Sequence, residues 1–246
     1  MNTVKLFNCD VACLNLNETL EQIERVINTK SYTQHVVINA GKVVLMQDNE
    51  ELRKIVQGCK FTNADGQSIV WAAKLLGKPL PERVTGIDIM EELVKKSAEK
   101  GYRIFFFGAK EEVVTKTVEH YQAFYPDLQV AGYRNGYFKE AEEQEVVAQI
   151  KNSKADILFV AFSSPAKEYF LNKYGPDLNT PFCMGVGGSF DVVAGVTERA
   201  PLWMQKSGLE WFYRFIQEPR RMWKRYLIGN SRFLLLLLKE WKNKGR

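Results

Sequence analysis

The sequence predicts an α/β fold in which a mostly parallel sheet is covered by helices on both faces. Two observations support this prediction. Short, nearly continuous apolar runs alternate with amphipathic stretches, and polar or glycine residues follow the apolar runs, where strands would end. At 246 residues the chain can bury a full core. We therefore expect a Rossmann-like body over residues 1–198 and a shorter C-terminal appendage over residues 199–246.

The predicted strands are short apolar runs that stop at a polar residue or a glycine. They cover residues 35–39, 61–63, 103–107, 128–131, 156–162 and 182–186. The predicted helices carry apolar residues at helical spacing. They cover residues 43–57, 68–76, 85–99, 111–124, 140–152 and 166–174. In such folds ligands bind at the carboxyl ends of the strands, so the residues that follow each strand are candidates for a site.

Residues 199–246 differ chemically from the rest of the chain. They hold 12 Lys or Arg against 3 Asp or Glu, although the whole chain has a net charge of only +5, and they hold four of the five tryptophans. Basic residues interleaved with Trp, Tyr, Phe and Leu suit a bilayer interface, which is anionic and apolar together. Two helices are expected, over 202–217 and 220–242, separated at Pro219 because proline cannot continue a helix interior.

Within the appendage, Leu209, Trp211 and Phe215 are expected to pack on the body. The basic residues expected to face outward are Arg214, Arg221, Lys224 and Arg225. A merely solvated basic face and stacking on nucleic-acid bases are the alternatives. The excess of Leu and Trp favours lipid, so no nucleic acid is expected as a partner.

Several whole classes of protein are not expected. Residues 1–20 hold Asn, Asp and Glu where a signal peptide needs an apolar core, and the run 233–238 is far shorter than the roughly 20 residues that span a bilayer. The four cysteines have no CxxC spacing, and neither His35 nor His120 has a ligand partner nearby in the sequence. We expect a cytoplasmic protein, at most peripheral on a membrane, with free thiols, no metal and no cofactor.

Asp65 is the carboxylate of most interest, because it follows a predicted strand and precedes a glycine in an apolar neighbourhood. A carboxylate at the ligand-binding edge of a sheet can act as general base on a hydroxyl. The plainer interpretations are an Asp-Gly turn and an N-cap for the next helix, and periodicity alone favours the cap. Arg83 lies in a Pro/Gly loop, where a phosphate clamp and a solvated charge are equally compatible with the sequence. Thr85 or Asp88 is expected to cap the helix that follows.

A glycine-rich turn follows the last predicted strand. Gly185, Gly187 and Gly188 precede Ser189 and Asp191. Glycines let a backbone approach a phosphate closely, and helix N-termini favour anions. Taken alone, however, so short a cluster indicates only a tight strand-to-helix turn.

Segments along nearly the whole chain follow one another in an order and spacing that match one bacterial family. They are VVINAGKV (36–43), ADGQSIVWAAKLLG (64–77), PERVTGIDIMEEL (81–93), RIFFFGA (103–109), GYRNGYF (132–138), SSPAKE (163–168), GVGGSFDVVAG (185–195), RAP (199–201) and GLEWFYRFIQEPRRMWKRY (208–226). Together they resemble the WecG/TagA/CpsF glycosyltransferases, glycosyltransferase family 26.

The resemblance implies an inverting enzyme that needs no divalent metal. It would move N-acetylmannosamine or a relative from a UDP-sugar to an undecaprenyl-diphosphate-linked acceptor, in teichoic acid-like cell-wall or surface polysaccharide synthesis. The enzyme would work on the inner face of the cell membrane. A homo-oligomer is compatible with the sequence, in which the body buries part of its site edge against a second copy.

The resemblance also assigns roles to residues. Asp65 matches the proposed catalytic base. The residues that match the substrate pocket are Asn39, Arg83 and Lys167, and those expected on the nucleotide side are Gly187, Gly188, Asp191 and Tyr137. The tail arginines that match residues thought to meet the lipid diphosphate are Arg214 and Arg221.

One segment departs from the family pattern. The family usually has Gly-x-Pro-Lys-Gln-Glu, whereas this chain reads Ser163-Ser164-Pro165-Ala166-Lys167-Glu168. Lys167 therefore replaces an amide that accepts and donates with a purely cationic donor. This change favours a carboxylated or differently substituted donor sugar.

Two competing functions are consistent with the same fold. A non-catalytic membrane-surface adaptor would explain the altered segment, but the presence of Asn39, Asp65 and Arg83 argues against it. A nicotinamide-dependent oxidoreductase is less favoured, because GxGxxG is absent after the first predicted strand.

Overall fold

The computed structural model describes residues 1–223 and 227–243, without the side chains of Arg221 and Met222. The strands are β1 (Thr3–Leu6), β2 (Cys9–Ala12), β3 (Thr33–Ile38), β4 (Phe61–Ala64), β5 (Arg103–Gly108), β6 (Gln129–Arg134), β7 (Ile157–Ala161) and β8 (Phe182–Gly185). Six of them form a parallel sheet in the order β4-β3-β8-β7-β5-β6, and β1 and β2 form a separate antiparallel hairpin. The predicted Rossmann-like α/β class is confirmed.

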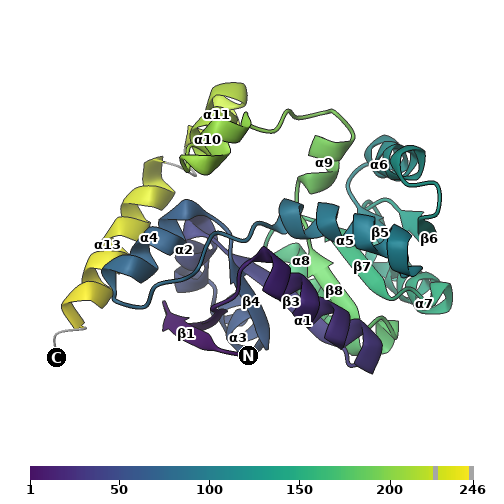
Figure 1. Cartoon of the computed structure of the whole chain (residues 1–246), viewed down its shortest axis with the longest axis horizontal. Coiled ribbons are helices and arrows are strands. Elements are labelled where there is room, and N and C mark those ends of the chain that lie inside the picture. Colours follow the sequence, from purple (N-terminus) through teal and green to yellow (C-terminus); the bar gives the residue numbers. More distant parts are fainter. Residues whose placement is uncertain (224–226, 244–246) are drawn as a thin grey trace.

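Helices lie on both faces of this sheet (Figure 1). They are α1 (Leu16–Thr29), α2 (Ala40–Asp48), α3 (Glu50–Gly58), α4 (Gln67–Leu75), α5 (Gly86–Lys100), α6 (Glu111–Phe124), α7 (Glu143–Ser153), α8 (Ala166–Tyr174), α9 (Ser189–Val193), α10 (Leu202–Lys206), α11 (Glu210–Gln217), α12 (Pro219–Trp223) and α13 (Gly229–Asn243), with 3-10 turns η1 (Glu140–Glu142) and η2 (Gly175–Leu178). Among the described residues, no helix is both long enough and apolar enough to cross a bilayer.

The central strands are apolar throughout because their side chains point alternately into two cores, one on each face of the sheet. In β5, Ile104 and Phe106 belong to the core beneath α1, α5 and α6, whereas Phe105 and Phe107 belong to the core beneath α7 and α8. Successive side chains of a strand point to opposite faces, so a strand covered on both sides has no solvent-facing position.

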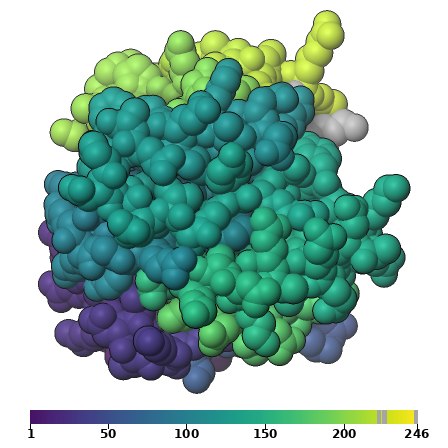
Figure 2. Space-filling view, turned by 90° about the vertical axis from the view of Figure 1, so that its right-hand side faces the viewer, coloured from purple at the N-terminus to yellow at the C-terminus, as the bar shows by residue number. Residues whose placement is uncertain are grey.

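The last helix, α13, is attached to the body along α2. Phe233 and Leu237 are buried in the same core as Val43 and Met46. Arg232 makes two hydrogen bonds to Asp48, at 2.6 and 2.7 Å. The C-terminal residues, in yellow and yellow-green, lie along the top of the molecule in Figure 2.

The structure confirms the six predicted strands of the sheet and reproduces two predicted helices, α6 and α8, at their predicted bounds. The hairpin β1–β2 and helix α1 were not predicted, whereas α9 follows the strand-to-helix turn that the glycine cluster indicated. The helix predicted over 43–57 is two helices, because the Asn49 side chain accepts a hydrogen bond from Leu52 N at 2.8 Å and starts α3.

The two predicted tail helices are also divided in the structure. The predicted helix 202–217 is wrong, because Gly208 adopts a φ of 75° and separates α10 from α11. Pro219 begins α12, in agreement with its expected place at a helix boundary. The predicted helix 220–242 corresponds to α12 and α13, which are separate elements.

Candidate active site

Asn39 and Asp65 lie next to each other at the carboxyl edge of the sheet. Each directly follows a strand, and the preceding residues Ile38 and Ala64 are paired across β3 and β4. The Asp65 backbone N donates to Ile38 O at 2.8 Å. Two residues far apart in the sequence are therefore neighbours, as the parallel-sheet prediction requires.

Asn39 has a local structural task as well. Its Oδ1 accepts from Lys42 N at 3.0 Å and caps α2. That bond leaves the side-chain NH2 group as a donor.

Asp65 is a partly buried carboxylate surrounded by charged groups. Burial raises its pKa above the ordinary value, and the nearby Glu210 carboxylate raises it further, whereas Arg214, Arg83 and Lys42 act in the opposite direction. The interpretation of Asp65 as a helix N-cap is wrong, because α4 is capped at Gly66 without a side-chain hydrogen bond. The cap expected before α5 is provided by Thr85, whose Oγ1 accepts from Asp88 N at 3.2 Å.

Arg83 is joined to the C-terminal segment through Glu210. Its Nη1 lies 2.9 Å from Glu210 Oε2, and both side chains are largely buried. The other oxygen of Glu210 lies 3.3 Å from Arg214 Nη2. The sequence indicated neither that Arg83 has a partner in the tail nor that Arg214 turns towards the body instead of outward.

The orientation of α11 explains a second difference from expectation. Glu210 and Arg214 are one turn apart and share the face that meets the body. Trp211 and Leu209 are therefore exposed, at 43% and 36%, so the prediction that they pack on the body is wrong. Phe215 is partly buried.

Lys167 lies along the glycine-rich turn that follows β8. A Cβ at Gly185 would collide with the Lys167 Cδ, and a Cβ at Gly187 would lie 3.6 Å from its Nζ. Gly187 has a φ of 57°, a conformation that glycine adopts without strain. The glycines thus allow a lysine ammonium to approach the turn closely.

A buried ion pair supports this corner of the site. Lys42 Nζ and Glu168 Oε1 are 2.6 Å apart, with side-chain exposures of only 4% and 2%. The same oxygen accepts from Ser164 Oγ at 3.0 Å and lies 3.9 Å from Lys167 Nζ. Burial raises the pKa of Glu168, but Lys42, Lys167 and these hydrogen bonds outweigh burial and hold it below its ordinary value.

Lys42, Glu168 and Glu210 are the site residues that the sequence analysis missed. All three lie inside the segments that carry the family resemblance, and each is a charge set among apolar or small residues. That pattern was the available signal. It did not show which opposite charge each one meets, because the partners are more than a hundred residues apart.

The residues expected on the nucleotide side are only partly brought together. Gly188 begins the turn into α9, and a Cβ there would lie 3.5 Å from Asp191 Oδ2. Tyr137 is exposed and follows β6, which is the outer strand opposite β4. Tyr137 and Asp65 therefore lie at opposite ends of the sheet edge.

Three of the basic tail residues that were expected to face outward cannot be compared with the structure. Lys224 and Arg225 lie outside the described residues, and the side chain of Arg221 is not described. Their expected outward orientation stays a prediction.

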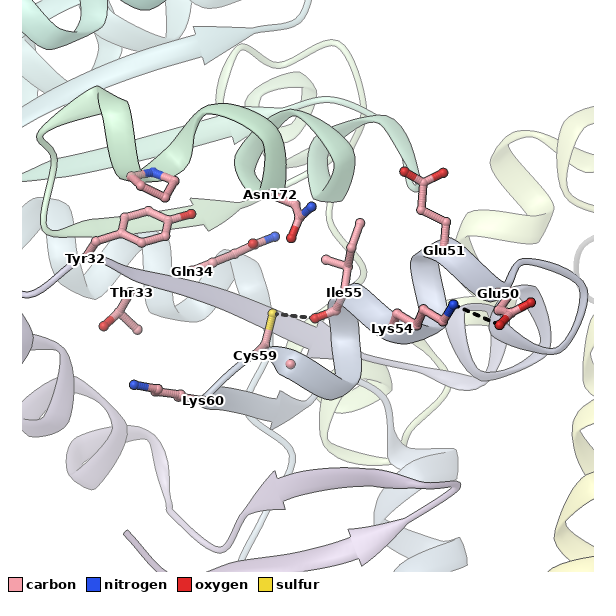
Figure 3. A pocket seen from close by; sticks show the side chains of 12 residues that line it. Tyr32, Thr33, Gln34, Glu50, Glu51, Lys54, Ile55, Cys59, Lys60 and Asn172 are labelled. Carbon is pink, nitrogen blue, oxygen red and sulfur yellow. Dashed lines mark hydrogen bonds and ion pairs between the residues drawn. The ribbon is translucent and has the colours of Figure 1, made fainter.

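A cavity of about 860 Å³ lies elsewhere, at the amino ends of the strands (Figure 3). Its lining includes Thr33 and Gln34 at the start of β3 and Lys60 just before β4. None of the predicted site residues lines it. Asp65 and its charged neighbours Glu210, Arg83 and Arg214 lie at the opposite, carboxyl edge of the sheet, so we place the candidate site there.

This edge combines a proton acceptor with cations. A partly buried carboxylate of raised pKa suits proton abstraction from a hydroxyl, and arginines beside it suit a diphosphate. Within residues 1–223 and 227–243, no three His, Cys, Asp or Glu side chains gather as metal ligands would.

Comparison with known proteins places this edge in a family context. The model of the glycosyl transferase WecG/TagA/CpsF family matches residues 4–246. A protein of Bacillus spizizenii strain W23 is 37% identical over 179 residues, which is 73% of this chain and 68% of that protein. A protein of Bacillus subtilis strain 168 is 32% identical over 245 residues, which is 99% of this chain and 94% of that protein. Both are named N-acetylglucosaminyldiphosphoundecaprenol N-acetyl-beta-D-mannosaminyltransferase.

Proposed function

The chain belongs to the WecG/TagA/CpsF family of glycosyl transferases, and from this premise we propose that it transfers N-acetylmannosamine or a close relative from a UDP-sugar to an undecaprenyl-diphosphate-linked acceptor. The names of two relatives support the sugar and the lipid-linked acceptor. The observation that carries the proposal is the meeting of Asp65, Arg83 and the tail residues Glu210 and Arg214 at one edge of the sheet. The product would feed cell-wall polysaccharide synthesis of the teichoic acid type.

We propose that Asp65 is the general base. Its carboxylate accepts the proton of the acceptor hydroxyl as that oxygen attacks the anomeric carbon in line. The bond from this carbon to the UDP oxygen breaks, and its electron pair leaves with UDP, so the anomeric configuration inverts. Asn39 lies beside Asp65, and we assign to its amide the orientation of the sugar or the hydroxyl.

The developing charge on the diphosphate needs cations or amide donors. We assign this part to the backbone of Gly187 and Gly188 and to the ammonium of Lys167 beside the turn. Asp191 and Tyr137 are assigned to the rest of the nucleotide. Arg83, Arg214 and Arg221 are assigned to the diphosphates of donor and acceptor. The division between a catalytic body, 1–198, and an appendage, 199–246, is part of the same proposal.

Transfer assays test the function directly. The purified full-length chain should release UDP from UDP-N-acetylmannosamine only when a synthetic polyprenyl-diphosphate-linked N-acetylglucosamine is present. A panel that adds carboxylated UDP-sugars addresses the effect of Lys167. Binding of UDP without transfer from any donor would favour the adaptor, and binding of NAD in its place would favour the oxidoreductase.

We further propose that the protein is peripheral on the inner face of the cell membrane. Exposed apolar side chains gather on the tail helices α10, α11 and α13 and on the neighbouring face of α4. They are Trp71, Leu75, Leu202, Trp203, Phe212, Ile216, Leu234, Leu235, Leu238 and Trp241. Basic residues of the same segment would add attraction to anionic lipid.

Replacing Leu202 and Trp203 with Ser should weaken binding to vesicles that contain an anionic lipid. Both side chains are exposed, at 71% and 65%, so folding should be unaffected. An apolar side chain that becomes buried in the bilayer stabilises membrane binding by about 1.5–3 kcal/mol. The double variant should therefore lose roughly 100-fold or more in partitioning to the vesicles. Co-sedimentation measures the loss. The matched control is Phe124→Ser, an exposed aromatic residue on α6; an equal loss in this control would contradict the proposed surface.

A further inference from the structure

Glu210 connects two arginines that reach the site from different parts of the chain. Its side chain is only 12% exposed, and each carboxylate oxygen contacts one guanidinium group, Arg83 Nη1 at 2.9 Å and Arg214 Nη2 at 3.3 Å. Arg83 belongs to the loop that precedes α5, whereas Arg214 belongs to α11. One carboxylate therefore sets the separation of two cations that the sequence places 131 positions apart.

Other contacts hold this ion cluster beside Asp65. Val84 N donates to Ala64 O at 2.9 Å, which ties the Arg83 loop to the end of β4. A Cβ at Gly208 would lie 2.8 Å from the Gln67 Cγ, so the turn before α11 lies against the first turn of α4. The loop and the segment that leads into α11 thus both lie close to Asp65 in space.

The two arginines keep donors for a substrate anion. A guanidinium group has five N–H donors, and the hydrogen bonds to Glu210 engage one terminal nitrogen of Arg83 and one of Arg214. Paired arginines suit the oxygens of a diphosphate. Without the carboxylate between them, the two cations would repel each other and the pair would separate.

We propose that Glu210 is a positioning residue for sugar transfer, which holds Arg83 and Arg214 together beside Asp65 so that both face one diphosphate group. This inference rests on the proposed function. Glu210 itself is not expected to touch the substrate. Because Glu210 is the first residue of α11, the positions of Arg83 and Arg214 relative to each other depend on the docking of that helix.

The test compares Glu210→Gln with Glu210→Asp in the full-length chain. Glutamine keeps the shape but loses the charge, and we expect kcat/KM to fall roughly 10- to 100-fold, as for loss of hydrogen bonds to charged groups. The charged groups around Asp65 are Glu210, Arg214, Arg83 and Lys42. Glu210 is the only anion among these four, and it raises the pKa of Asp65. Its removal should lower that pKa and move the acid limb of the pH–rate profile to lower pH. Aspartate keeps the charge but is shorter, so its profile should keep the acid limb with an intermediate loss of rate.

A control carboxylate lies on the same part of the chain. Glu198 is exposed and accepts from the Tyr213 hydroxyl at 3.1 Å, which also joins the segment before α10 to α11. Glu198→Gln should leave both kcat/KM and the pH profile unchanged. An unshifted acid limb in Glu210→Gln, or a rate equal to that of Glu198→Gln, would overturn the inference. A shifted limb in a variant whose melting temperature is unchanged would support it.

Binding measurements separate the two possible sources of the diphosphate. If the arginines hold the donor, Glu210→Gln should weaken UDP binding in calorimetry. If they hold the acceptor, UDP affinity should stay constant while KM for the lipid-linked acceptor rises. Absence of both changes overturns the inference. Absence of any transfer by the unmodified chain would instead overturn the proposed function itself.

Discussion

Replacing Asp65 with Asn should reduce sugar transfer by roughly 100-fold or more while UDP still binds. Asparagine has almost the same size but cannot accept the hydroxyl proton. The substitution removes no helix cap, because the N-cap of α4 is Gly66 and makes no side-chain hydrogen bond. Steady-state transfer and UDP calorimetry on the same preparation measure the two effects. Asp10→Asn, an exposed aspartate on β2, is the control for a general effect of the change. Turnover near that of the wild type would remove Asp65 as the base.

The environment of Asp65 also predicts a pH dependence. Burial and Glu210 raise its pKa in the folded state, so the transfer rate should fall with acidification at a higher pH than an exposed aspartate would give. Since the folded pKa lies above the unfolded one, the stabilising contribution of this group is present below the unfolded pKa and is lost as pH rises through the folded pKa. Asp65→Asn should therefore melt at a higher temperature than the wild type near pH 7. Equal melting curves at that pH would contradict the raised pKa.

Replacing Lys42 with Met should destabilise the protein by about 3 kcal/mol, because Glu168 would stay buried without its closest partner. This is the lower end of the usual range, since Lys167 Nζ lies 3.9 Å from the same carboxylate oxygen. Urea denaturation measures the difference. The double variant Lys42→Met/Glu168→Leu removes both charges and should recover most of the lost stability.

Two comparisons make this prediction specific. Lys54 and Glu50 form an exposed pair at 3.0 Å, so Lys54→Met should leave the unfolding midpoint unchanged. The Glu168 pKa is lowered in the folded protein, so its stabilising contribution is present above the unfolded pKa and is lost as pH falls through the folded pKa. The difference between wild type and Lys42→Met should therefore shrink towards acid pH. A double variant as unstable as the single one would show that the pair's packing matters more than its charges.

The sequence motifs were sufficient to identify the family to which the chain belongs. The family match over residues 4–246 confirms the resemblance, and the predicted enzyme class agrees with the names of the relatives. The assignment of roles to individual site residues remains a proposal. The adjacency of Asn39 and Asp65 followed from one rule, that parallel strands end at the same edge of a sheet.

Local patterns determined the six sheet strands, the bounds of α6 and α8, and the place of Asp65 at a strand end, because burial imposes a periodicity that is visible within a few residues. Only the tertiary structure decided that Arg83 meets Glu210 and that Lys42 meets Glu168, pairs separated by 127 and 126 positions. An ion pair leaves no periodic trace in a sequence, since its energy depends on the distance between two charges and on their burial, and both are set by how distant elements pack.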